Sequence, residues 1–136
     1  MRLPEGTHLF SNGVLVVNTT PHSIRFQETD GSLVEVPSNP KFLVNARAVE
    51  TKVSDLLVKT AFVGTDDGTK VLNTLEDYYC QHAQDPNSGI KHLAIVGSVI
   101  AAQAYPGRVV AMTPVPGFER VAPAEKRMSI DKFTTY

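Results

Sequence analysis

The chain has 136 residues, of which 42% are hydrophobic and 20% charged, and its formal net charge at pH 7 is −1. This length and balance are typical of one globular domain with a hydrophobic core of its own, so we expect a single domain over residues 1–136. A near-neutral chain lacks the basic surface on which non-specific binding to phosphate backbones depends, so we expect no duplex nucleic acid among its partners.

The cysteine content and the apolar runs bear on the location of the protein. Cys80 is the single cysteine, so the chain cannot form an internal disulfide and nothing indicates an oxidising compartment. The first ten residues, MRLPEGTHLF, lack the apolar segment of a signal peptide. No apolar run approaches the roughly 18 residues that a membrane span needs. We therefore expect a cytoplasmic, soluble protein with no membrane partner.

The first half of the chain is predicted to form mostly strands. Residues 1–12 resemble an extended lead-in, and Asp30-Gly31 is a strong hairpin signal because both residue types tolerate positive φ. The sequence GTDDGT, residues 64–69, indicates a turn. Apolar runs and period-two alternation predict strands over Val14–Val17, Ile24–Gln27, Leu33–Val36, Lys41–Val49 and Leu56–Val63.

The second half changes to a helical period. An apolar stripe predicts a helix over Asn73–Ala83, with Asn73 and Glu76 spaced as a capping box. A second, short helix is predicted over Ser98–Ala104. Strands are expected over residues 90–97 and 108–112, with an edge strand near 128–133. This order of elements favours the α+β class: a small, mostly antiparallel sheet with two helices in a single domain.

A polar cluster follows the first apolar strand in VLVVNTTPHSIRFQ, residues 14–27. In a functional interpretation, Asn18 supplies both hydrogen-bond donors and acceptors, Thr20 a hydroxyl, and His22 a donor or base near neutral pH. In a local interpretation, the same side chains bond backbone groups of the turn, and Pro21 fixes the bend. The sequence leaves both interpretations open.

A second candidate feature is the joint AIVGSVIAAQ, residues 94–103. Gly97-Ser98 stands between a strand and a helix start, where free backbone N–H groups attract anions. The alternative is a Ser98 N-cap after a tight turn. Arg108 follows this helix and is predicted to return to the same mouth, where it would hold a phosphate. The other arginines considered are Arg25, Arg47, Arg120 and Arg127.

Motifs for metal binding or nucleophilic catalysis are lacking. The four histidines, His8, His22, His82 and His92, show no ligand spacing, and Cys80-x-His82 alone is a weak signal. There is no G-x-S-x-G motif. We expect no metal, no cofactor and no catalytic residue.

Two segments resemble a small protein family that is widespread in bacteriophages, prophages and bacteria. They are VVNTTPHSIRFQETDGSLVEVPSNP, residues 16–40, and HLAIVGSVIAAQA followed by GRVVAMTP, residues 92–104 and 107–114. Members of the family begin with a V-N-L-T-P-H type motif and carry an I-V-S type strand end. The positions that carry the likeness are Asn18, Thr20, Pro21, His22 and Ser98. The chain departs from the pattern at Asn39, where the family has a loop glycine, and over residues 68–89, which replace a shorter, proline-rich connection.

Small phage proteins of this size include viral sponges, which withhold the nucleotide signals of bacterial defence systems such as CBASS and Thoeris. By this analogy the chain is expected to sequester a small cyclic nucleotide or cyclic ADP-ribose-like signal without cleaving it, as a homo-oligomer. The Tyr78–Tyr79 stripe is the candidate interface. The alternatives are a small nucleotide hydrolase that uses His22 as general acid or base, and a structural or interaction protein of a phage. The expected ligand site comprises Asn18, Thr20, His22, Gly97, Ser98 and Arg108.

Overall fold

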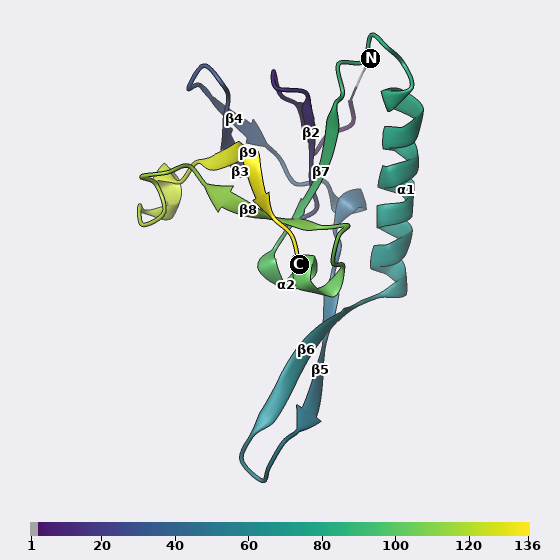
Figure 1. The fold of residues 1–136 in the computed structure, drawn as a ribbon, viewed down its shortest axis with the longest axis vertical. Coiled ribbons are helices and arrows are strands. Elements are labelled where there is room, and N and C mark those ends of the chain that lie inside the picture. Colours follow the sequence, from purple (N-terminus) through teal and green to yellow (C-terminus); the bar gives the residue numbers. More distant parts are fainter. Residues whose placement is uncertain (1–2) are drawn as a thin grey trace.

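A seven-stranded mixed sheet organises the fold in the computed structural model, which describes residues 3–136 (Figure 1). The strand order is β1-β2-β7-β8-β9-β3-β4. Its antiparallel pairs are β1–β2, β3–β4 and β8–β9, and its parallel pairs are β2–β7, β7–β8 and β3–β9. The strands are β1 (Thr7–Leu9), β2 (Val14–Asn18), β3 (Ile24–Gln27), β4 (Leu33–Val36), β7 (His92–Gly97), β8 (Val110–Pro114) and β9 (Met128–Thr134).

The remaining elements are two helices, α1 (Asp66–Ala83) and α2 (Val99–Ala104), and a separate antiparallel pair, β5 (Ala46–Lys52) with β6 (Val58–Gly64). Short 3-10 turns cover Pro40–Phe42 and Pro123–Glu125. Over both sheets the described residues make four antiparallel pairings and three parallel ones, so the predicted α+β class with two helices is confirmed, and the seven-stranded sheet itself is mixed. Neither helix in residues 3–136 has the length and apolarity needed to cross a bilayer.

The core lies on both faces of the central strands. All five residues of β2 are buried, as its continuous apolar run predicts for a strand covered on both sides. On one face, Val17 and Ile95 pack against Leu72 and Leu75 of α1 and the alanines of α2. On the other face the sheet curls over itself, so that the Phe10 and Phe26 rings lie 5.6 Å apart at their centroids. This curling brings β3 and β4 close to the end of β2.

Helix α1 begins at Asp66, seven residues before the predicted start. Thr65 is its N-cap, because its Oγ1 accepts a hydrogen bond from the Gly68 N–H at 3.0 Å. Asp66 and Asp67 then occupy the first turn, where negative charge is favoured by the helix dipole. The predicted turn over residues 64–69 and the Asn73–Glu76 capping box are therefore wrong: the turn-forming residues here are a helix start.

The strand predicted over residues 41–49 also differs. Asn39 caps a 3-10 turn over Pro40–Phe42, since its Oδ1 accepts a hydrogen bond from Lys41 N–H at 3.0 Å. Strand β5 therefore starts only at Ala46. With β6 it forms a two-stranded ribbon, called the arm below (residues 46–64), which projects from the rest of the protein (Figure 1).

Tyr105, at the end of α2, fixes the root of the arm. Its buried hydroxyl donates to the Asn45 carbonyl at 2.9 Å, just before β5, and accepts from the Thr65 N–H at 2.7 Å, just after β6. Gly64 and Gly68 lie against its ring, where a Cβ atom would approach Tyr105 atoms to 2.5 and 2.0 Å. One side chain therefore joins both ends of the arm to the start of α1.

A carboxylate beside the β3–β4 hairpin makes stability depend on pH. The Ser11 hydroxyl donates to Glu28 at 2.5 Å and, with the Thr29 N–H, holds the pKa of Glu28 below its usual range. Because the folded pKa is the lower one, this stabilisation is present above the unfolded pKa and is lost as pH falls through the folded pKa. We expect Glu28→Gln to reduce the fall in the free energy of unfolding between about pH 5 and pH 3, measured by urea titration. Glu50→Gln, on the exposed arm, is the control, and an unchanged pH profile for Glu28→Gln would contradict the expectation.

Candidate functional site

The polar cluster after β2 is built around Asn18, whose side chain is fully buried. Its Nδ2 donates to the carbonyls of His22, at 2.7 Å, and Val36, at 3.1 Å. Its Oδ1 accepts from the Thr20 N–H at 2.9 Å and lies 2.7 Å from the Thr20 hydroxyl. These four bonds use the whole capacity of an asparagine amide. Asn18 therefore forms the turn and joins it to β4, and it offers nothing to a ligand.

Thr20 and His22 lie further out on the same turn. The Thr20 hydroxyl is also 3.0 Å from the His22 carbonyl, so it closes the turn from within. The His22 imidazole is exposed, and no hydrogen bond joins it to another side chain in residues 3–136. The turn thus holds the His22 backbone rigidly and leaves its ring open to solvent.

A hollow of about 550 Å³ lies beside this turn, and we call it the His22 pocket. Thr20, His22 and Ser98 line it, so the structure brings three of the six predicted site residues together. The parallel pairing of β2 with β7 explains this meeting, because Asn18 lies opposite Val96 and both strands end at the same edge. Further lining side chains come from β3, β4, β8, the segment before β9 and the start of β9: Arg25, Glu35, Met112, Lys126 and Met128.

The charges in the His22 pocket are mixed, with two basic groups and one acidic group. Arg25 points outward from β3, between the buried Ile24 and Phe26, and lies directly across from Glu35 in β4. Lys126 is half-buried and precedes β9. Arg25 was among the arginines considered from the sequence. Its position between the apolar Ile24 and Phe26 is the sequence pattern that predicts an outward-facing side chain. Lys126 is about 100 residues from the turn, and no local pattern connects the two.

Gly97 and Ser98 serve mainly to join β7 to α2. A Cβ atom on Gly97 would lie 2.6 Å from Val109 Cγ1, so the close packing of the strand end requires glycine. Ser98 Oγ accepts from the Ala101 N–H at 3.0 Å and is the N-cap of α2. Gly97 is buried and does not line the His22 pocket, whereas Ser98 is exposed at its rim. The N-cap interpretation of this joint is therefore confirmed.

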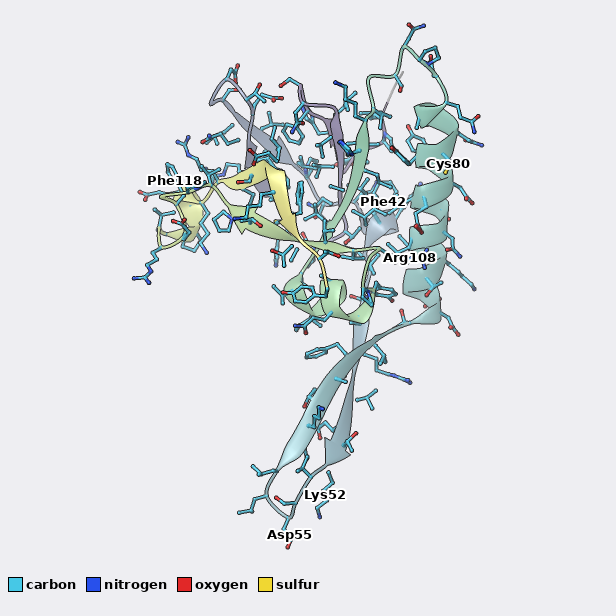
Figure 2. All side chains as sticks on the ribbon, viewed as in Figure 1. Phe42, Lys52, Asp55, Cys80, Arg108 and Phe118 are labelled. Carbon is cyan, nitrogen blue, oxygen red and sulfur yellow. The ribbon has the colours of Figure 1, made fainter. Side chains whose placement is uncertain are left out.

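Arg108 does not line the His22 pocket. Its Nε donates to Glu76 Oε1 at 3.1 Å and its Nη2 to Asn73 Oδ1 at 2.7 Å, and the guanidinium forms an ion pair with Glu76 (Figure 2). The prediction that Arg108 returns to the mouth beside Ser98 is wrong. The reason is that α1 runs past the α2–β8 connection and presents a carboxylate and an amide there. Arg108 instead ties α1 to this connection.

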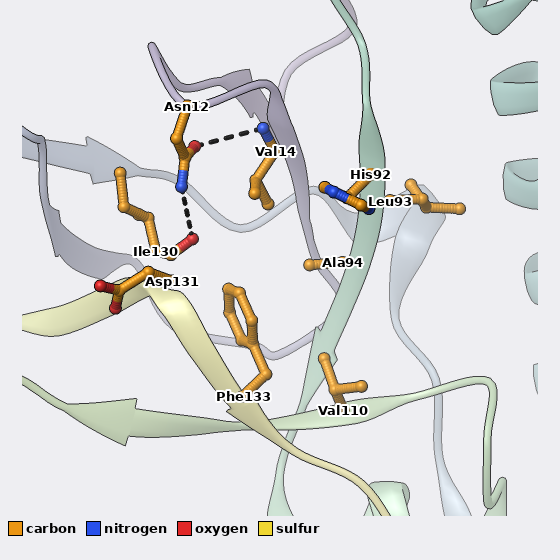
Figure 3. Close-up of a pocket in the computed structure, with 9 residues that line it drawn as sticks. All are labelled: Asn12, Val14, His92, Leu93, Ala94, Val110, Ile130, Asp131 and Phe133. Carbon is orange, nitrogen blue, oxygen red and sulfur yellow. Dashed lines mark hydrogen bonds between the residues drawn. The ribbon is translucent and has the colours of Figure 1, made fainter.

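A second hollow, of about 390 Å³, opens on the curled face of the sheet (Figure 3). Ala94, Val110 and Phe133 give it an apolar floor. Asn12, on its rim, is bonded to the Ile130 carbonyl at 2.8 Å and accepts from the Val14 N–H at 3.2 Å. This hollow has no arginine or lysine in its lining, so the His22 pocket is the better candidate for an anionic ligand.

Metal binding has no support from the arrangement of side chains: the part of the chain that the structure describes contains no group of three or more His, Cys, Asp or Glu able to hold an ion.

Comparison of the chain with protein-family models, curated proteins and solved structures finds no match.

Proposed function

We propose that this protein sequesters a small phosphorylated ligand of the nucleotide class in the His22 pocket without cleaving it. One observation carries the proposal: a single pocket combines Arg25 and Lys126 with the polar groups of Thr20 and His22 and with an apolar wall. A volume of about 550 Å³ suits a ligand of this size.

Each part of the pocket matches one part of such a ligand. A guanidinium binds phosphate oxygens through two directed hydrogen bonds, and an ammonium adds a compact positive charge. The thioethers of Met112 and Met128 give a polarisable apolar wall for a base. The exposed His22 ring is the hydrogen-bonding group available to a ribose or base edge, whereas the Thr20 hydroxyl is engaged within the turn and forms part of the wall. Glu35 lies across from Arg25 and offsets part of its positive charge. Binding of small inorganic anions is therefore disfavoured, because they cannot use the other contacts of the pocket.

The biological role proposed with this chemistry rests on the resemblance to the phage and prophage family. In that role the protein acts as a sponge in the host cytoplasm and withholds a cyclic nucleotide or cyclic ADP-ribose-like signal from a defence system. Asn18 and Gly97 then act as supports of the pocket, and Arg108 as a support of α1.

The test is to incubate the pure protein with a panel of cyclic dinucleotides, cyclic oligonucleotides and cyclic ADP-ribose isomers, desalt it, denature it and chromatograph the released material. Recovery of an intact ligand supports capture. Fragments instead indicate a hydrolase in which His22 acts as general acid or base. No uptake of any compound contradicts the proposal and favours a structural or interaction role.

Variants of the basic residues locate the site. We expect Lys126→Ala and Arg25→Ala each to raise the dissociation constant of the captured ligand about tenfold or more, measured by calorimetry. The reason is that a charged hydrogen bond contributes about 1.5–3 kcal/mol, and each 1.4 kcal/mol changes the dissociation constant about tenfold. His22→Ala is expected to weaken binding less. Arg120→Ala removes an exposed arginine that does not line the pocket and is the matched control. Normal binding by both Lys126→Ala and Arg25→Ala would place the site elsewhere.

A further inference from the structure

The arm carries an apolar surface that the rest of this chain does not cover. Its exposed side chains include Leu56 at 94%, Val53 at 64%, Leu57 at 61% and Val58 at 54% relative accessibility. Figure 2 shows Lys52 and Asp55 at the far end of the arm, away from the sheet. A two-stranded ribbon is marginally stable alone in water, and both of its edges can accept another chain. The tip of the arm therefore exposes a group of large apolar side chains of the kind that proteins usually bury.

The direction of the arm is fixed at its root. The Tyr105 hydroxyl bonds the chain on both sides of the ribbon, at Asn45 and at Thr65. The tip is consequently presented at a set position relative to the sheet, and docking it costs less ordering entropy than docking a free loop would.

The charges favour contact of the arm with the body of another copy over contact between two arms. The arm carries Arg47, Lys52 and Lys59 against Glu50 and Asp55, a net charge of +1, whereas the whole chain is −1, which leaves −2 for the rest. The pairing register places Arg47, Val49, Lys59 and Ala61 on one face, with Val53 and Leu57 beyond them. This face is apolar with two cations and no acid, so two such faces repel each other.

A matching surface lies beside α1. A hollow of about 230 Å³ between α1 and the sheet is lined by Leu15, Val17, Phe42, Leu75, Tyr78 and Leu93, with the exposed Thr74 at its rim. Helix α1 itself carries four acids, Asp66, Asp67, Glu76 and Asp77, against Lys70. The hollow itself is apolar, and the helix beside it has an excess of negative charge, although Glu76 is already paired with Arg108. The arm, by contrast, is apolar and basic.

We propose that the arm of one chain docks on the α1 hollow of a second copy, with Leu56 and Leu57 at the hollow, and that the second copy reciprocates. The contact area supports reciprocity. A seven-residue ribbon is ~23 Å long and ~10 Å wide, so one arm contact buries ~450 Å² in total, counting both surfaces. One contact is too small for a stable complex, whereas two approach the ~1,000 Å² that a specific interface needs. This inference is independent of the His22 pocket and of its ligand.

The first test is the mass of the ligand-free protein by sedimentation equilibrium. We expect twice the 14.8 kDa of the chain, and at least a tenfold increase in the dimer dissociation constant for the double variant Leu56→Ser/Leu57→Ser. Both side chains are exposed, so the substitutions leave the fold intact, which circular dichroism verifies. Leu33→Ser, at a 42% exposed leucine outside the arm, is the matched control and keeps the dimer. A monomeric wild type, or a dimer that the double variant does not weaken, would overturn the proposal.

The second test locates the contact. Two single-cysteine variants, Leu56→Cys and Thr74→Cys, each also carrying Cys80→Ser, are mixed and treated with oxidised glutathione. We expect a disulfide-linked heterodimer of the two variants, because the arm tip of one chain lies at the α1 hollow of the other. Linkage of Leu56→Cys only to itself indicates contact between arms and contradicts the proposed geometry.

Discussion

Replacing Asn18 with alanine is expected to lower the free energy of unfolding by about 3 kcal/mol, measured by urea titration at pH 7. The substitution removes all four hydrogen bonds of the amide at once. The Val36 carbonyl, in a residue only 1% exposed, then has no amide donor, and the Thr20 N–H loses its acceptor. Each buried polar group left without a partner costs about 1–3 kcal/mol, and the cavity left by the side chain adds to this.

Two controls separate this structural role from a role in binding. Asn12→Ala also removes two hydrogen bonds, but Asn12 is only half-buried, so we expect a loss nearer 1 kcal/mol. His22→Ala removes an exposed ring and is expected to change stability by less than about 0.5 kcal/mol. If Asn18→Ala instead kept its stability and lost only ligand capture, Asn18 would belong to the binding surface.

Local patterns predicted most of the sheet because the relevant forces act over a few residues. The continuous apolar run of β2, the alternation in β3 and the Asp30-Gly31 turn each specify their element without help from distant parts of the chain. Ser98 likewise marked the start of α2 through its own hydrogen bond to Ala101. These elements are confirmed, whereas the parallel pairings of the sheet depend on contacts that no local pattern contains.

The start of α1 and the cationic side of the pocket were missed for a related reason. Thr65, Asp66 and Gly68 suit a turn and a helix start equally well, and Tyr105, about 40 residues later, favours the helix by packing on the glycines. Lys126 reaches the pocket only because β9 pairs with β3 and β8. Arg108 was assigned to the wrong partner because the packing of α1 against the α2–β8 connection, which no local pattern contains, places Asn73 and Glu76 beside it.

Replacing Gly68 with alanine is expected to lower the free energy of unfolding by about 2 kcal/mol, although alanine is the better helix former. The added Cβ would lie 2.0 Å from the Tyr105 hydroxyl oxygen and 2.9 Å from Cζ. The ring cannot swing away cheaply, because Tyr105 is 5% exposed and its hydroxyl bonds both Asn45 and Thr65. Overpacking of this kind costs about 1–3 kcal/mol, and the gain in helix propensity offsets up to about 1 kcal/mol of it.

A double-mutant cycle with Tyr105→Phe identifies the cause. Phenylalanine removes the oxygen that the new methyl group meets at 2.0 Å, so Gly68→Ala is expected to cost less in the Tyr105→Phe background than in the wild type. Tyr105→Phe alone is itself expected to cost about 1 kcal/mol, because the Thr65 N–H loses its acceptor. Gln81→Ala, on the exposed face of α1, is the control and is expected to change stability by less than about 0.5 kcal/mol. Equal costs of Gly68→Ala in both backgrounds would show that the Tyr105 hydroxyl does not set the limit at this position.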